Sequence, residues 1–209
     1  MLTKNADLHG NAPDKSHVAL LLIDVINDLD FPDADRLLEF ALPMARQIAA
    51  LKDRAKQEGV PVVYVNDNFG RWRSDFNAQV EHCLEEGVNG KPLVELLRPH
   101  EDDYFVLKPK HSGFFSTTLD LLLEYLGVKA VILTGISTNI CVLFTANDAY
   151  MRDFHLLVPS DCVASNTAEE NRHALDQIRK VLKADTRPSA EISFEALRSV
   201  DSDASHARP

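Results

Sequence analysis

A cysteine at position 141 lies where the sequence predicts that a buried strand turns sharply into a helix. The run Val131–Leu133 is apolar and largely β-branched, as in a strand, and Gly135 gives the next turn conformational freedom. Thr138 could cap the following helix, with Cys141 in its first turn. A thiol there faces the positive end of the helix dipole, which favours the thiolate over the thiol. It also lies beside unpaired backbone N–H groups, which could hold an oxyanion. The spacing indicates a nucleophile that attacks a carbonyl carbon; the alternative is a cysteine that only packs in the core.

Two charged residues are expected near this cysteine, because each follows a predicted parallel strand. Val18–Ile23 is a continuous apolar run, typical of a strand covered on both faces, and Asp24 comes directly after it. Lys108 follows the run Tyr104–Leu107 in the same way. Open α/β sheets bind ligands at the carboxyl ends of their strands, so both side chains could serve a site there. Without further context, the simpler interpretation is a turn-capping carboxylate and a solvated lysine.

Strand and helix patterns alternate along nearly the whole chain. This predicts a three-layer α/β/α sandwich around a parallel six-stranded, Rossmann-like sheet with strand order 3-2-1-4-5-6. Pro43 suits the first turn of a helix, so we expect the main helix to begin there, after short helical turns over Ala34–Ala41. No G-x-G-x-x-G follows the first strand and no Walker A motif is present, which argues against nucleotide binding. Further strands are expected at Val62–Val65, Leu156–Val158 and, as a short edge strand, Ala184–Arg187.

Length and composition fit one soluble domain. Of 209 residues, 45% are hydrophobic and 26% charged, enough for a sizeable core. We expect a flexible arm over residues 1–17, a domain over 18–188 and a tail over 189–209. There is no signal-peptide pattern and no apolar run of the roughly 18 residues that a membrane span needs, so no membrane partner is expected. The 3 cysteines lack paired spacing, which suits a reducing, cytoplasmic location, and the net charge of −10 argues against nucleic acid as a partner.

Three motifs resemble those of the isochorismatase-like cysteine hydrolases, a superfamily that includes nicotinamidases, N-carbamoylsarcosine amidases and ureido-group hydrolases. They are GISTNICV followed by TANDA, LLIDVIND, and the spacing from lysine to Ser-Gly-Phe in KPKHSGFF. The resemblance implies that Cys141 is the nucleophile and that Asp24 and Lys108 complete a catalytic triad. It also implies a cis peptide bond at Ile136–Ser137, with the backbone amides of Ser137 and Cys141 forming the oxyanion hole.

The resemblance covers about residues 18–184 and includes departures. Many members have glutamine where this chain has Ile26, so a polar contact of the pocket is missing or supplied elsewhere. His111 stands where the family often has an aromatic residue, so we expect it to shape the pocket rather than to transfer protons. Lys110 and His111 are fallback candidates should Lys108 not reach the site.

Aromatic side chains near the strand ends are the candidate pocket wall, and they suggest a compact, partly apolar site. The candidates for substrate binding are Phe69, Trp72, Phe76, His111, Phe115 and Phe144.

A metal site is not expected. Nicotinamidases hold a divalent metal with an aspartate and several histidines near the end of the second strand, whereas this chain has Asp67 there and no histidine until His82. One carboxylate alone is a poor transition-metal site, so we expect no metal and no other cofactor, and nicotinamide ranks low as a substrate. The adjacent His82 and Cys83 would not face each other on a helix, and Cys162 is interpreted as a packing residue.

The function that follows is hydrolysis of a carbon–nitrogen bond in a small amide or ureido compound through a thioester. Two alternatives remain open: hydrolysis of a vinyl ether, as in isochorismatases, and a non-catalytic member that keeps the pocket for ligand binding. Family members commonly form dimers or tetramers, so a homo-oligomer is expected.

Overall fold

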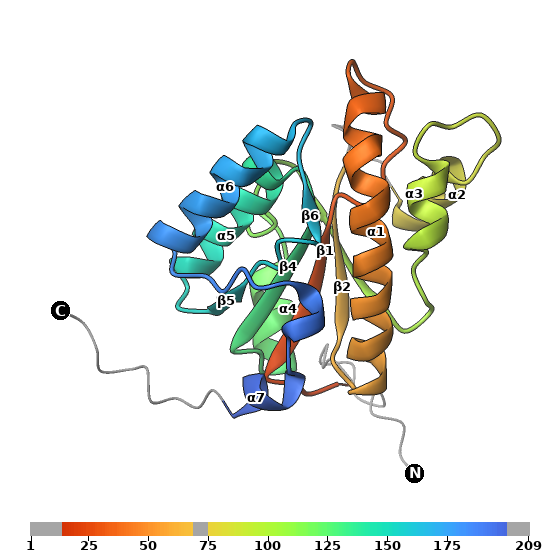
Figure 1. Cartoon of the computed structure of the whole chain (residues 1–209). Helices are drawn as coiled ribbons and strands as arrows, with labels where there is room; N and C mark the ends of the chain where they lie inside the picture. Colours follow the sequence, from red (N-terminus) through yellow and green to blue (C-terminus); the bar gives the residue numbers. More distant parts are fainter. Residues whose placement is uncertain (1–13, 69–74, 200–209) are drawn as a thin grey trace, which may run out of the picture.

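A central parallel sheet organises the computed structural model, which describes residues 14–68 and 75–199 (Figure 1). Five strands run side by side in the order β3-β2-β1-β4-β5, and β6 pairs with β4. The strands are β1 (Val18–Ile23), β2 (Val62–Asp67), β3 (Tyr104–Lys108), β4 (Ala130–Ile136), β5 (His155–Leu157) and β6 (Val163–Ala164). The helices are α1 (Ala34–Gln57), α2 (Phe76–Cys83), α3 (Lys91–Leu96), α4 (Leu119–Leu126), the π-helical turn η1 (Thr138–Val142), α5 (Leu143–Tyr150), α6 (Ala168–Val181), the 3-10 turn η2 (Ser189–Glu191) and α7 (Phe194–Arg198).

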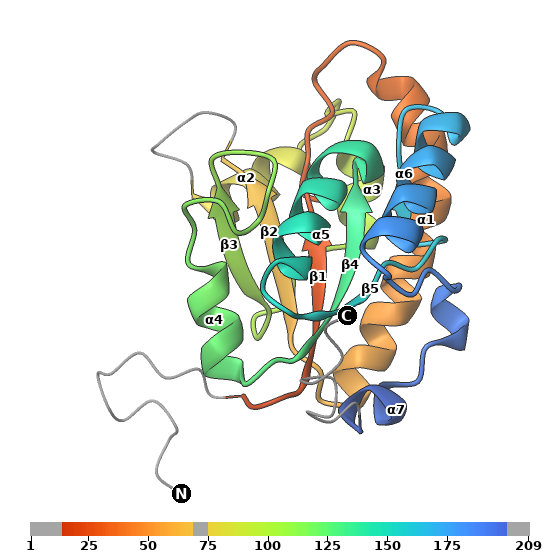
Figure 2. The ribbon, with the colours of Figure 1, turned by 90° about the vertical axis from the view of Figure 1, so that its left-hand side faces the viewer.

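The continuous apolar run of β1 is explained by burial on both faces. Val18, Leu20 and Leu22 pack with α1, α2, α3 and α7, whereas Leu21 and Ile23 pack with α4, α5 and α6 on the other side. Because side chains of a strand alternate between the two faces, every position of β1 is apolar. Figures 1 and 2 show β1 in the middle of the sheet between these helix layers. The predicted three-layer α/β sandwich is confirmed.

Helix α1 differs from the expectation, since it runs through Pro43 instead of beginning there. A proline inside a helix leaves the carbonyl of the residue four positions earlier without its N–H donor. Here Pro43 and Glu39 both lie on the exposed face, where water can bond that carbonyl. Apolar side chains on either side of the proline keep one face of the helix packed: Leu37, Ala41, Met44, Ala45 and Ile48 are buried.

The sixth strand also differs from the expected order. Val163 and Ala164 pair with Gly135 and Ile136 of β4, so β6 occupies the part of β4 that the short strand β5 leaves free. The expected edge strand at 184–187 is reduced to one bridge between Leu157 and Asp185. Strand β4 is therefore bordered by two short strands in succession.

The C-terminal segment is packed as far as α7. Phe194 and Leu197 are buried in the core beside β1, and Arg54 of α1 donates to the carbonyl of Ser189 at 3.0 Å. Residues 189–199 thus pack onto the domain beyond the boundary expected at 188. Residues 1–13 of the arm expected over 1–17, and residues 200–209 of the tail, fall outside the described residues. Within the described ranges, none of the helices is both long and apolar enough to cross a membrane.

Candidate active site

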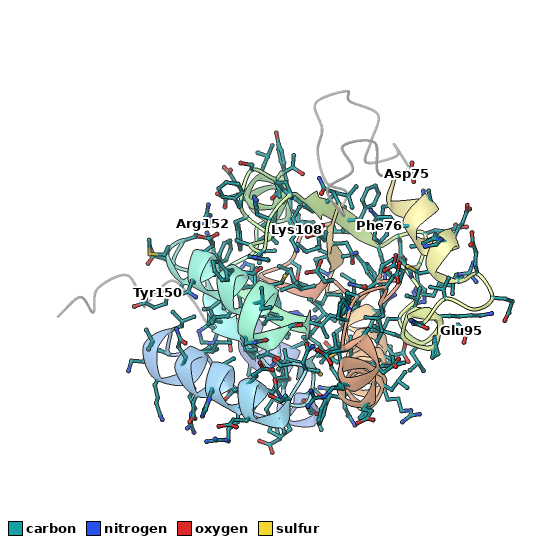
Figure 3. The ribbon with its side chains drawn as sticks, turned by 90° about the horizontal axis from the view of Figure 1, so that it is seen from above. Asp75, Phe76, Glu95, Lys108, Tyr150 and Arg152 are labelled. Carbon is teal, nitrogen blue, oxygen red and sulfur yellow. The ribbon has the colours of Figure 1, made fainter. Side chains whose placement is uncertain are left out.

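Asp24, Lys108 and Cys141 meet at the carboxyl edge of the sheet. Nζ of Lys108 lies 2.8 Å from Oδ2 of Asp24 and 3.5 Å from Sγ of Cys141. Figure 3 looks onto this edge and shows Lys108 near its centre. Lys108 is 0% exposed and its long side chain spans the distance from β3 to the end of β1, so Lys108 rather than Lys110 makes the ion pair. The structure brings together the three residues that the motifs singled out.

Asp24 is held by the backbone of the neighbouring strand. The Asp67 amide donates to Oδ1 of Asp24 at 2.7 Å, and the Asp24 amide donates to the carbonyl of Val65 at 3.0 Å. Burial raises the pKa of the Asp24 carboxyl, although the Lys108 charge and the hydrogen bonds to the carboxyl act to lower it. This carboxyl therefore takes up a proton more readily than an exposed aspartate, as a general base that accepts a thiol proton must.

Lys108 is the cation of the site. Burial would lower the pKa of its ammonium, but the charges of Asp24, Cys141 and Asp67 raise it above the usual value, so the group stays protonated. Oδ2 of Asp67 lies 3.6 Å from Nζ of Lys108. Sequence reasoning weighed Asp67 only as a metal ligand and missed this contact. The sequence feature that could have predicted the contact is the position of Asp67 at the end of β2, because this residue pairs in register with Lys108 of β3.

The turn that carries Cys141 is tighter than expected. Gly135 has a φ of 109°, and a Cβ there would lie 2.0 Å from the carbonyl oxygen of Ile23, so only glycine lets β4 approach β1 this closely. The Ile136–Ser137 peptide bond is cis, and the Ser137 carbonyl accepts from the amides of Ile140 and Val142. The backbone then forms the π-helical turn η1 before α5 begins.

Two expectations about this turn are wrong. Thr138 does not cap the helix, because its hydroxyl donates instead to Oδ1 of Asn171 on α6 at 2.5 Å. The Cys141 thiolate is not favoured in the free protein: burial and the adjacent Asp24 carboxylate raise the pKa of the thiol to about 12, and the Lys108 charge only partly opposes them. The thiol therefore needs a base before it can attack a carbonyl.

The described candidate pocket residues do not all lie beside the triad. Nδ1 of His111 lies 3.8 Å from Sγ of Cys141, and the ring centroid of His111 lies 5.4 Å from that of Phe144. Phe115 and Phe144 are 54% and 52% exposed. Phe76 is 4% exposed and stacks on Phe105, so it packs in the core beside β3 instead of forming an open pocket wall.

Two other candidates, Phe69 and Trp72, lie outside the described residues. Ile26, which replaces the family's glutamine, is buried in the core. Its backbone is held by the buried side chain of Asn66, which accepts from the Ile26 amide and donates to the Ile26 carbonyl.

The other two thiols lie in the core cluster on the α1 side of the sheet. Cys83 and Cys162 are buried, and burial raises the pKa of Cys83 to about 12 and that of Cys162 further. His82 lies 3.7 Å from Asp28 and 3.5 Å from Glu85.

A possible metal-binding group lies far from the triad. Among the described residues, the His, Cys, Asp and Glu side chains close enough to share an ion are those of His100, Asp102 and Asp103. They precede β3, at the edge of the sheet opposite the triad, and both aspartates already pair with Lys56.

Comparison with known proteins identifies the family. The model of the isochorismatase domain matches residues 18–186. The chain belongs to the isochorismatase family. It is 40% identical over 178 residues to YaaI of Bacillus subtilis, an uncharacterized isochorismatase family protein, with 85% of this chain and 97% of YaaI covered. It is 29% identical over 163 residues to the probable inactive nicotinamidase At3g16190 of Arabidopsis thaliana, with 73% of this chain and 83% of that protein covered.

Among solved structures, the N-carbamoylsarcosine amidase of Thermoplasma acidophilum matches with a TM-score of 0.64 and 28% identity, over 84% of this chain and 98% of that one. The fold and the sequence together place the chain in a family of hydrolases that includes amidases.

Proposed function

We propose that this chain is a cysteine hydrolase that cleaves a carbon–nitrogen bond of a small amide or ureido compound, with Asp24, Lys108 and Cys141 as its catalytic triad. The observation that carries the proposal is the position of the Lys108 ammonium, 2.8 Å from the Asp24 carboxylate and 3.5 Å from the Cys141 sulfur in a buried site. A buried acid, a buried cation and a thiol in mutual contact form the arrangement that nucleophilic catalysis by sulfur requires.

The first half-reaction forms a thioester. Asp24, which hydrogen-bonds the thiol, takes the proton of Cys141 as the sulfur bonds to the substrate's carbonyl carbon. The carbonyl oxygen becomes an oxyanion, for which the backbone amides of Ser137 and Cys141 are the proposed donors; removing one such donor typically costs about 3 kcal/mol. When the carbon–nitrogen bond breaks, the nitrogen leaves with the proton from Asp24.

The second half-reaction consumes water. A water molecule adds to the thioester carbon while a base takes its proton. The carbon–sulfur bond then breaks to release the acid and a Cys141 thiolate, to which the base returns the proton. Throughout both halves, Lys108 balances the negative charge that is shared between Asp24 and the sulfur. The ureido class of substrate is supported by the likeness to an N-carbamoylsarcosine amidase.

A non-catalytic binding protein is the second candidate, because one relative is named a probable inactive nicotinamidase. The contacts within the triad argue against it, since burying a lysine and an aspartate is costly and a binding pocket does not need them. Vinyl ether hydrolysis is weaker still, because that reaction does not call for a sulfur nucleophile.

The test is release of ammonia or an amine from a panel of small primary amides and ureido acids. The wild-type chain is compared with Cys141→Ala and Asp24→Asn, and Cys83→Ala serves as a matched control because its thiol is buried away from the triad. We expect release that disappears in the first two variants and persists in the control. Near-normal turnover by Asp24→Asn would refute the assignment, and tight binding of a substrate without product would support the non-catalytic candidate.

A further inference from the structure

The sulfur of Cys141 has proton-exchanging groups on both of its sides. Asp24 approaches it from the interior and is 6% exposed, whereas His111 is exposed and places Nδ1 3.8 Å from Sγ. A contact of this length to sulfur is within hydrogen-bonding range, with donor and acceptor set by the imidazole tautomer. Asp24 serves the proton of the thiol and of the leaving nitrogen, and the water of the second half-reaction needs a base as well.

The segment that carries His111 is fastened to the helix that follows Cys141. The Ser112 hydroxyl donates to the Asp148 carboxylate, and the Gly113 amide donates to the Thr145 hydroxyl at 3.0 Å. The same Thr145 hydroxyl donates to the Cys141 carbonyl at 2.7 Å. Because Thr145 and Asp148 both belong to α5, the backbone next to His111 and the backbone of Cys141 are tied to the same helix, which keeps the two residues close together.

Among the described residues, the charged groups near His111 are already paired or exposed. Asp24 and Lys108 lie behind the sulfur as an ion pair, and Asp148 on α5 is occupied by Ser112 and by Arg152, whose Nη1 is 3.8 Å away. Lys110 is the next residue in the chain and is exposed. On the α5 side, the ring of His111 meets the uncharged ring of Phe144. The thiol of Cys141 is thus the titratable group in direct contact with the imidazole.

We propose that His111 is a second proton-transfer residue of the site, which exchanges a proton with Cys141 from the solvent side and serves the half-reaction of water. This inference rests on the proposed function and gives it a second base. Asp24 handles the proton that passes from the thiol to the leaving nitrogen, and His111 handles the proton of water.

In this step, His111 takes one proton from water and returns one proton to the sulfur. Neutral His111 takes a proton from the water molecule as its oxygen bonds to the thioester carbon, which forms an imidazolium. The carbon–sulfur bond then breaks to leave a thiolate, and the imidazolium returns its proton to Sγ across the 3.8 Å contact. By microscopic reversibility, neutral His111 can also take the thiol proton in the substrate-free protein. That reverse step gives a thiolate beside an imidazolium and needs no substrate to be observed.

The experiment is the rate of alkylation of Cys141 by iodoacetamide, an uncharged probe, as a function of pH on the full chain. Cys141→Ala gives the background from the two buried thiols. In the wild type we expect the rate to rise with pH, because the neutral form of the imidazole is the one that can accept the thiol proton. In His111→Gln, which keeps polarity but cannot titrate, and in His111→Phe, this rise should vanish and the rate at pH 7.5 should fall about tenfold or more. His100→Gln removes another exposed histidine before β3 and should leave the profile unchanged.

The outcomes separate this inference from the proposed function. A profile in His111→Gln that matches the wild type, or a wild-type thiol that is inert up to pH 9, would overturn the role of His111. If amide turnover is present while alkylation does not depend on His111, the proposed function stands and the inference fails. If alkylation depends on His111 but no amide or ureido compound is turned over, proton exchange at the sulfur stands and the proposed function fails.

Discussion

Replacing Lys108 with methionine should destabilise the protein, because the change leaves the Asp24 carboxylate buried without its cation. Methionine has a similar volume and no charge, so packing changes little and the effect reports on the ion pair. At an effective dielectric constant of about 20, unit charges at the observed 2.8 Å attract by about 6 kcal/mol. Desolvation of both groups offsets part of this attraction, and breaking a buried pair by removing one partner typically costs about 3–5 kcal/mol.

The pH dependence of this loss follows from Asp24. Burial already raises the pKa of its carboxyl in the folded protein, and removing Lys108 removes the strongest influence that lowers it. A carboxyl whose folded-state pKa lies above its unfolded value favours folding while protonated, and this stability is lost as the pH rises through the folded pKa. The destabilisation by Lys108→Met should therefore be smaller at pH 5 than at pH 8.

Urea unfolding at these two pH values measures the effect. At pH 8 we expect a loss of about 3 kcal/mol in the free energy of unfolding, which at roughly 2–4 °C per kcal/mol lowers the melting temperature by about 6–12 °C. The double variant with Asp24→Asn should lose less than the sum of the single changes, since neither charge is then left alone. Lys110→Met, at an exposed lysine two positions later, is the control and should change little. Wild-type stability of Lys108→Met at pH 8, or strict additivity in the double variant, would refute the reasoning.

The other predictions concern the turn and the thiol. Gly135→Ala places a Cβ 2.0 Å from the Ile23 carbonyl oxygen and should cost more than about 4 kcal/mol in unfolding free energy. Gly59→Ala is the control: Gly59 has a φ of 67° but open space around it, so this change should cost about 1–2 kcal/mol. Equal losses in the two variants would contradict the close approach of β4 to β1. Asp24→Asn should lower the pKa of the Cys141 thiol from about 12, because it removes a negative charge and leaves Lys108, so alkylation by iodoacetamide should begin at lower pH. An alkylation profile in Asp24→Asn that matches the wild type would show that the Asp24 charge does not act on the thiol.

Several features of the fold were predictable because they depend on local pattern and on one topological rule. The apolar runs of β1 and β4 have no polar face, so both strands had to be buried on both sides in a parallel sheet. The rule that ligand sites form at the carboxyl ends of such strands then placed Asp24, Lys108 and Cys141 at one edge. Their contact at 2.8 and 3.5 Å agrees with that placement.

Other features depend on tertiary packing that short patterns do not contain. Helix α1 can pass through Pro43 because Pro43 and Glu39 lie on its exposed face, and α7 is held against the core by Phe194 and Leu197. The pairing of β6 with β4 depends on where the short strand β5 ends. The upward shift of the Cys141 pKa was not predicted, for a similar reason. The position of a thiol at a helix start is visible in sequence, but its burial beside a carboxylate is not.

The charges of the site determine when its sulfur becomes reactive. In the substrate-free protein, burial and the Asp24 carboxylate hold the pKa of the thiol high, and the Lys108 ammonium contacts both groups. If the proton moves from Cys141 to Asp24, the charge that opposed ionisation disappears, and the new thiolate faces Lys108 at 3.5 Å. The sum of charges in the buried triad is the same before and after, so the transfer incurs little additional desolvation. A sulfur that loses its proton only when a neighbouring base accepts it is a weak nucleophile at rest, and it becomes able to attack once a carbonyl carbon is brought within reach.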